Sequence, residues 1–241
     1  MGAFLSRQGA KADPMHARME KVYQGYFKTG ENRKILCVGR NYHAHIKELG
    51  NTPPPEPMWF DKPVSSLLLP GESFKWHPSY KEIHHEIELG VVIGKGGKNI
   101  AEADYMDHIS GYFLGIDFTN RSLQDDFKRD GADWSLAKGA DTFGAISDFV
   151  DKSEIEDWND LELELSVNGE TRQSENTKLM IFGVPRLIAD ISKYVMLREG
   201  DLIYTGTPAG VSAVTRGDEV HGHLRKPGSQ SNLLEVNVKV E

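Results

Sequence analysis

Short apolar segments of strand length dominate the chain from residue 34 onward. Some are continuous, such as the run that ends at Gly39, and others alternate, as where glutamates separate Leu161, Leu163 and Leu165. Asn168-Gly169 follows this alternating run and predicts a tight hairpin into a further strand. The strands predicted in this way cover residues 34–38, 86–93, 112–119, 161–167, 201–205 and 233–240.

Helical periodicity is confined to a few segments. Asn99 followed by Glu102 predicts a capping box at the start of a short helix, and Pro185 suits the first turn of a longer one. The predicted helices cover residues 100–108, a short segment around Leu123 and Phe127 that Gly131 ends, and residues 184–196, with Gly200 as the terminator. Many strands with few helices predict a β-rich α+β fold and argue against a doubly wound sheet.

Composition excludes several classes of protein. The 241 residues contain 28 Lys and Arg against 36 Asp and Glu, so the net charge is −8, which argues against a general nucleic-acid binder. The single cysteine, Cys37, excludes a disulfide framework and any multi-cysteine metal site, and its apolar neighbours indicate a buried core thiol. No apolar run approaches the ~18 residues of a membrane-spanning helix, so we expect no stable membrane insertion.

The first 33 residues are interpreted as an extension before a single folded domain at residues 34–241. Gly2 and Ser6 match the pattern for N-myristoylation, although a single acyl chain anchors only marginally. Basic residues such as Arg7 and Arg18 suggest a degenerate mitochondrial presequence as the alternative, interrupted by Asp13. The sequence therefore leaves a cytoplasmic and a mitochondrial location open, and favours an unmodified extension.

Three carboxylates form a candidate cation site. Residues i and i+2 of a strand share a face, so Glu86 and Glu88 are expected to project together. Taken alone this pair fits a solvated acidic face, but Asp117 lies among large apolar residues, where an unpaired carboxylate is costly. An all-oxygen set suits a hard cation, Mg²⁺ first, with Mn²⁺ or Ca²⁺ as alternatives. His84 and His85 face opposite ways on a strand, and packing is the favoured interpretation for both.

An ordered series of short motifs then carries a family resemblance. The motifs are Val38-Gly39-Arg40-Asn41-Tyr42, His85-Glu86-Ile87-Glu88-Leu89-Gly90, Gly115-Ile116-Asp117-Phe118-Thr119, Gln124-Asp125, Trp134-Ser135-Leu136-Ala137-Lys138 and Tyr204-Thr205-Gly206-Thr207-Pro208-Ala209-Gly210-Val211. In this order the chain resembles the fumarylacetoacetate hydrolase superfamily, most closely its short acylpyruvase and oxaloacetate decarboxylase branch. The resemblance implies a mixed β-sandwich and β-roll, a homodimer, and Mg²⁺ or Mn²⁺ held by Glu86, Glu88 and Asp117.

Six further residues are assigned roles, partly from their spacing and chemistry and partly from this resemblance. His45 and Glu48 are spaced i, i+3, so a short helix would bring them together, and they match the family's catalytic dyad. Lys138 matches the lysine that stabilises a developing enolate. The substrate is expected to meet Arg40, Gln124 and Thr207.

The leading functional hypothesis is a Mg²⁺-dependent hydrolase that cleaves a C–C bond in acylpyruvates through a pyruvate enolate. The expected partner is a small anionic 2-oxo acid. Oxaloacetate decarboxylation is the second hypothesis, and isomerisation or tautomerisation of 2-oxo diacids is the third, because one site can support all three. A metal-binding protein without enzymatic activity is the alternative of another class.

Overall fold

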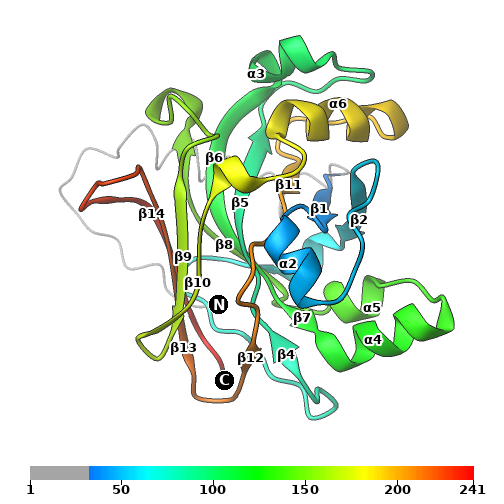
Figure 1. Ribbon diagram of the computed structural model, residues 1–241, viewed down its shortest axis with the longest axis vertical. Coiled ribbons are helices and arrows are strands. Elements are labelled where there is room, and N and C mark those ends of the chain that lie inside the picture. The colour runs from blue at the N-terminus through cyan, green and yellow to red at the C-terminus, as the bar shows by residue number, and fades with distance from the viewer. Residues whose placement is uncertain (1–32) are drawn as a thin grey trace, which may run out of the picture.

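The computed structural model describes residues 33–241 (Figure 1). The motif for N-myristoylation and the candidate presequence lie outside the described residues. The division of the chain at residue 34 stays a prediction.

Fourteen named strands form three sheets in the described part of the chain. The seven-stranded sheet has the order β2 (Met58–Lys62), β1 (Ile35–Gly39), β11 (Leu202–Tyr204), β5 (Ile87–Ile93), β6 (Ile109–Asp117), β8 (Gly144–Asp151) and β3 (Leu67–Leu68). The four-stranded sheet has the order β10 (Glu170–Asn176), β9 (Glu162–Val167), β13 (Glu219–Arg225) and β14 (Asn232–Lys239). The small sheet joins β12 (Ala213–Val214), β4 (Ile83–His84) and β7 (Thr119–Asn120).

The predicted strands are confirmed, with ends shifted by a few residues. The hairpin also forms at the predicted place: β9 and β10 pair antiparallel around Asn168 and Gly169, whose φ angles of 52° and 81° suit a primed turn. The β-rich α+β fold with few short helices is therefore confirmed.

Strands β1 and β11 are far apart in sequence yet run parallel in the large sheet, with Ile35 opposite Leu202. Strand β11 then pairs antiparallel with β5, and β5 pairs with β6, where Ile87 lies opposite Ile116. This order brings the carboxyl ends of β1, β6 and β11 and the start of β5 to the same end of the sheet. The candidate site residues are spread along the sequence, and this topology gathers them.

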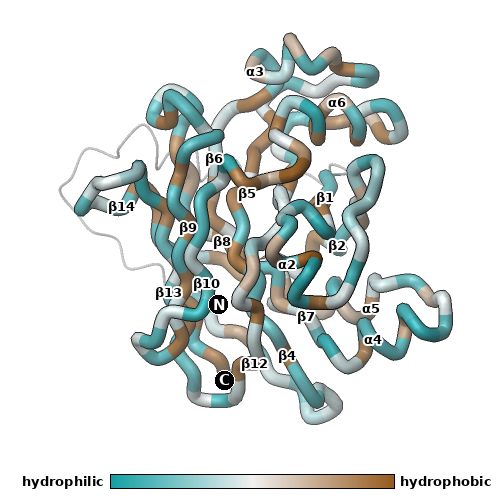
Figure 2. The backbone as a smooth tube through the Cα atoms, viewed as in Figure 1, coloured by the Kyte–Doolittle hydropathy of each residue, from teal (hydrophilic) through white to brown (hydrophobic). Residues whose placement is uncertain are grey.

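The two larger sheets enclose most of the core. Strand β14 packs against β6 and β8, and Figure 1 shows the four-stranded sheet as a layer beside the larger one. Figure 2 shows hydrophobic positions gathered along β5 and β6 and hydrophilic ones along α4. All seven residues of β5 are buried, Glu88 included, so this strand presents no solvated acidic face. The large sheet is covered on both faces there, because Leu89 and Val92 belong to different core clusters.

The helices are short and lie outside the sheets. They are α2 (His43–Glu48), α3 (Tyr105–His108), α4 (Arg121–Asp130), α5 (Ser135–Lys138) and α6 (Val184–Tyr194), with single 3₁₀ turns at Val64–Ser66, Glu102–Asp104, Lys152–Glu154 and Thr177–Leu179. Gly131 ends α4 in the left-handed conformation, as predicted. Among the described residues, no helix has the length and apolar character that crossing a membrane requires.

Two helix boundaries differ from the prediction. Helix α6 ends at Tyr194 and not near Gly200, because Leu197 exchanges backbone hydrogen bonds with Gly97 and needs extended backbone. The capping box at Asn99 does not form. Its backbone N–H donates to the carbonyl of Ser192 instead, and the 3₁₀ turn of this segment begins only at Glu102.

Candidate active site

Glu86, Glu88 and Asp117 lie together at the end of the large sheet. One oxygen of each carboxylate lies within 4.8 Å of the other two, and the residues are 5%, 1% and 1% exposed. Glu86 directly precedes β5, Glu88 is its second residue, and Asp117 ends β6. The backbone N–H of Asp117 donates to the carbonyl of Glu86 at 2.8 Å, which fixes the strand ends side by side. The strand spacing thus places the two glutamates as expected.

Three buried cations contact two of these carboxylates. Nζ of Lys138 lies 2.7 Å from both Glu86 Oε2 and Asp117 Oδ2. Nζ of Lys62 lies 2.7 Å from the other oxygen of Asp117, and Arg121 pairs with the other oxygen of Glu86. Burial alone would raise the pKa of Glu86, but Lys138 and Arg121 hold it well below its usual range.

Lys138 has no free hydrogen-bond donor in this arrangement. Besides the two carboxylates it donates to Thr119 Oγ1 at 2.7 Å, so all three ammonium protons are engaged. Burial opposes its charge, yet Asp117 and Glu86 raise the pKa of Lys138 above its ordinary value. Lys138 therefore contributes fixed positive charge at the floor of the site.

Glu88 is the carboxylate that pairs with no cation among residues 33–241. Among the described residues its side chain has one hydrogen-bond partner, the backbone N–H of Gly206, which donates to Oε2 at 2.6 Å. Burial raises the pKa of Glu88 well above its usual range, and the charges of Asp117 and Glu86 raise it further. A buried all-oxygen set with one unmatched carboxylate fits a divalent cation that contacts Glu86, Glu88 and Asp117.

His45 and Glu48 meet on α2, as the helical spacing predicts. Nδ1 of His45 lies 3.3 Å from Oε2 of Glu48, and the imidazole is buried. The Glu48 carboxylate also accepts from the backbone N–H of Gly210, at 3.1 Å and 3.3 Å. Burial lowers the pKa of His45, while the charge of Glu86 and the hydrogen bond that His45 donates to Glu48 oppose that change. The ring is thus held neutral and oriented. His43, two residues earlier, is exposed.

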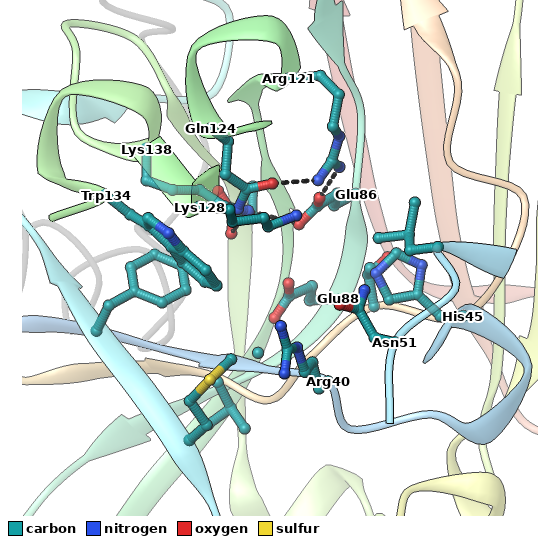
Figure 3. Close-up of a pocket in the computed structure, with 17 residues that line it drawn as sticks. Arg40, His45, Asn51, Glu86, Glu88, Arg121, Gln124, Lys128, Trp134 and Lys138 are labelled. Carbon is teal, nitrogen blue, oxygen red and sulfur yellow. Dashed lines mark hydrogen bonds and ion pairs between the residues drawn. The ribbon is translucent and has the colours of Figure 1, made fainter. Parts of the chain in front are cut away.

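A pocket connects most of these groups. Its lining includes Arg40, Gln124 and Thr207, the three residues expected to meet substrate, together with His45, Lys138 and the three carboxylates. Figure 3 shows Gln124 bonded to Arg121, and Arg121 bonded to Glu86.

The hydroxyl of Thr207 is already engaged. It donates to the carbonyl of Ile87 at 2.9 Å and accepts from Nε2 of Gln173 at 2.8 Å. Oε1 of Gln173 also meets His85 Nδ1, at 2.9 Å, so His85 packs behind the site, as expected. Thr207 therefore holds its loop against the start of β5 and lines the pocket at the same time.

Lys62 and Arg121 are two of the charged site residues that sequence reasoning missed. Lys62 ends β2 and shares a strand face with Met58 and Phe60, both of which line the pocket. Arg121 lies three residues before Gln124 on α4, so helical spacing puts both on one face. These periodicities were the available signals, but the partners lie on other strands and the sequence does not pair them.

Asn41 is a third residue that the sequence reasoning did not single out. Its Nδ2 donates to the carbonyls of Thr205, at 2.7 Å, and Phe182, at 3.0 Å, while Oδ1 accepts from the Phe182 N–H. The amide thereby ties the loop after β1 to the loop after β11, beside the carboxylates.

Comparison with known proteins adds an independent observation. A family model described as fumarylacetoacetate (FAA) hydrolase, C-terminal, matches residues 34–235. The chain is 48% identical over 220 residues to the mitochondrial oxaloacetate tautomerase FAHD1 of Arabidopsis thaliana, covering 91% of this chain and 95% of that protein. It is also 48% identical over 196 residues to the mitochondrial oxaloacetate decarboxylase of Dictyostelium discoideum, covering 81% and 89%.

The fold has a solved relative with a bound metal. The fumarylpyruvate hydrolase of Pseudomonas aeruginosa, solved in complex with Mn²⁺ and pyruvate, superimposes with a TM-score of 0.79 at 33% identity, covering 89% of this chain and 93% of that one. The segment matched by the family model contains every residue of the pocket described above.

Proposed function

The chain belongs to the fumarylacetoacetate hydrolase family, and from that premise we propose that it is a metal-dependent enzyme acting on oxaloacetate through an enolate. The observation that carries the proposal is the buried set of Glu86, Glu88 and Asp117, in which Glu88 is paired with no cation of the described part of the chain. The names of the two relatives at 48% identity favour oxaloacetate over the acylpyruvates that the sequence put first.

The proposed cofactor is Mg²⁺, with Mn²⁺ as an effective substitute. Glu86, Glu88 and Asp117 would hold it, and when bound it would polarise the 2-oxo group of the substrate. The Mn²⁺ in the solved fumarylpyruvate hydrolase supports the choice of a hard divalent cation.

The residues of the chain provide the rest of the chemistry. In decarboxylation the bond between C3 and the distal carboxylate breaks, and its electron pair moves into the enolate, which the fixed charge of Lys138 stabilises. In tautomerisation a proton leaves C3 and another reaches the 2-oxo oxygen. Neutral His45, oriented by Glu48, is the group that holds or moves the proton.

Acylpyruvate hydrolysis is the second candidate, and the His45–Glu48 pair is the observation that favours it. Hydrolysis requires an attacking water, and a buried neutral imidazole backed by a carboxylate is suited to take its proton. Decarboxylation needs no such water. The two activities therefore place different demands on His45.

The test is a substrate panel on the purified full chain. Oxaloacetate, acetylpyruvate and fumarylpyruvate are offered with EDTA, with Mg²⁺ and with Mn²⁺, while pyruvate formation and loss of the enol absorbance are followed separately. We expect turnover of oxaloacetate that EDTA abolishes and either cation restores. Faster turnover of acetylpyruvate would favour the hydrolase, and failure of all three substrates would favour a metal-binding protein without this activity.

We also propose a homodimer and a mitochondrial location. The second rests on the names of the relatives and on Arg7, Lys11 and Arg18 near the start of the chain. Light scattering of the purified protein tests the first, and the N-terminus of the protein isolated from its cell tests the second: a start beyond Met1 or Gly2 supports import, and an acylated Gly2 contradicts it.

A further inference from the structure

One face of α4 is turned toward the pocket. Arg121, Gln124 and Lys128 follow one another at spacings of three and four residues, which puts them on a single helical face, and all three line the pocket. The opposite face is solvated, and Arg129 there pairs with Asp126 at 3.0 Å. Arg121 already donates to Oε1 of Gln124 and to Glu86. Lys128, which lies two turns after Arg121 on the same helix, takes no part in these hydrogen bonds.

Lys128 is a half-buried cation with a weak partner. Its side chain is 26% exposed, and its Nζ lies 3.4 Å from Oδ1 of Asp125, a carboxylate that is 62% exposed on the same helix. A pair of this kind contributes little, because water screens it. Nζ also lies 5.6 Å from the ring centroid of Trp134. Burial lowers the pKa of Lys128, and the like charges of Arg121 and Arg40 lower it further.

Arg40 is a second cation that lines the pocket, and it has no partner of opposite charge among residues 33–241. Its guanidinium makes no ion pair or hydrogen bond with residues 33–241. Its backbone φ is 56°, a conformation that is costly for a residue with a side chain and that tends to persist where function requires it. Figure 3 shows the Arg40 and Lys128 side chains extending into the cavity.

The charges of the pocket therefore divide into two groups. Lys62, Lys138 and Arg121 are matched by Glu86 and Asp117, whereas Arg40 and Lys128 face the cavity with no buried carboxylate of their own. An apolar wall of Met58, Phe60 and Trp134 also lines the pocket. A ligand with an anionic group at each end and carbon between them matches this arrangement.

We propose that Lys128, with Arg40, binds the second carboxylate of a 2-oxo diacid and so makes the site selective for dianionic over monoanionic substrates. This deepens the proposed function and rests on it for the placement of the 2-oxo acid end at the three carboxylates. Lys128 is a specificity-determining residue in this account, and the carbon chain between the two carboxylates packs against the Trp134 side of the pocket.

The test measures binding of a matched ligand pair that differs only at the far end. 2-Oxoglutarate and 2-oxovalerate have the same number of carbons, and only the first has a second carboxylate. Titration calorimetry of the full chain with saturating Mg²⁺ gives the ratio of their affinities. We expect a preference of at least tenfold for 2-oxoglutarate, its loss in Lys128→Met, and its recovery in Lys128→Arg. Arg129→Met, next to it on the solvated face of α4, is the matched control and is expected to keep the ratio.

The outcomes separate this proposal from the proposed function. Equal affinities of the parent protein for the two ligands, or an unchanged affinity ratio in Lys128→Met, would overturn the second-carboxylate site. Neither result would contradict turnover of oxaloacetate. A Lys128-dependent preference in a protein that turns over no substrate would support the site and contradict the proposed reaction. Failure of the parent protein to bind either ligand would overturn the second-carboxylate site, whereas the substrate panel decides the proposed reaction independently.

Discussion

Nζ of Lys62 lies 2.7 Å from Oδ1 of Asp117, and both side chains are at most 2% exposed. The same ammonium faces the backbone carbonyls of Phe143, at 3.3 Å, and Lys138. One lysine from β2 thus neutralises the acid at the end of β6 and satisfies backbone groups around the α5 segment. Removing it leaves a buried charge and buried carbonyls without partners.

We expect Lys62→Met to lower the free energy of unfolding of the metal-free protein by about 3–5 kcal/mol, the usual cost of removing one partner from a buried pair. Urea titration in the presence of EDTA measures it. Lys75→Met is the matched control, since Lys75 pairs with Glu241 on the surface and its loss should cost less than about 1 kcal/mol. Equal effects of the two substitutions would contradict the structural role given to Lys62.

Glu88 should give the metal-free protein a characteristic pH dependence. Its pKa in the folded protein is raised above the ordinary 4.5. At pH values between 4.5 and this raised pKa, the folded state holds a proton that the unfolded chain has released. Stability therefore falls as the pH rises through this window, by at most about 1.4 kcal/mol per pH unit.

Glu88→Gln removes this titration. We expect the variant to lose less stability than the parent between pH 5 and the folded pKa of Glu88, while its affinity for Mn²⁺ falls at least tenfold. Urea titrations at a series of pH values with EDTA, and calorimetry with Mn²⁺, measure the two effects. A slope that is identical in both proteins would show that another group carries the pH dependence.

Gly206 is the residue whose N–H reaches Glu88, and its conformation leaves no room for a side chain. Its φ is 101°, and an added Cβ would lie 2.7 Å from Cβ of Asn41. We expect Gly206→Ala to destabilise the protein by about 1–3 kcal/mol through the strained backbone and to weaken Mn²⁺ binding at least tenfold by displacing the N–H.

Gly217 supplies the control for that substitution. Its φ is 94°, similar to that of Gly206, but an added Cβ meets nothing within 4 Å. Gly217→Ala therefore reports the cost of the backbone conformation alone and should keep the parent affinity for Mn²⁺. Loss of Mn²⁺ binding in both variants would show that neither the crowding at Asn41 nor the hydrogen bond to Glu88 explains the weaker binding in Gly206→Ala.

His45 should separate hydrolysis from decarboxylation. We expect His45→Ala to lower kcat for acetylpyruvate by at least about 10²-fold, since it removes the base that activates water, and to spare much of the oxaloacetate decarboxylation. Steady-state kinetics with both substrates measures this, and Mn²⁺ titration verifies that the metal site is intact. An equal loss of both activities would overturn the separate role.

Glu48 should tune the same imidazole. Its hydrogen bond raises the pKa of His45, so Glu48→Gln lowers that pKa, and the acid limb of the pH profile for acetylpyruvate should move to lower pH. We expect kcat to fall at the same time, because the ring loses its orienting carboxylate. An acid limb that stays in place would mean that His45 is not the titrating base.

The parts of the site that follow local periodicity could be predicted from the sequence. Glu86 and Glu88 share a face because a strand repeats every two residues, and His45 meets Glu48 because a helix brings i and i+3 together. Neither inference needs knowledge of the rest of the fold. The same holds for the hairpin at Asn168-Gly169, whose turn chemistry is local.

The parts that depend on sheet order could not be predicted. Lys62 reads as a polar interruption of an apolar segment until β3, which follows it, is paired with β8 at Gly144, the residue opposite Asp117. The premature end of α6 likewise depends on the pairing of Leu197 with Gly97, one hundred residues away in the chain. In each case the deciding partner lies in a distant segment.

The parallel pairing of β1 with β11 joins segments that lie far apart in the chain. Lys34 meets Asp201 across 167 residues of sequence, and Glu88 receives the N–H of Gly206 across 118. Contacts of such long range form slowly, because closing the intervening loop costs entropy before the contact is made. A nascent chain that has not yet released β11 holds Glu86, Glu88 and Asp117 without the loop that completes their surroundings. Cation binding is therefore expected to be among the last steps of folding, and it would stabilise the fold only after β1 and β11 have paired.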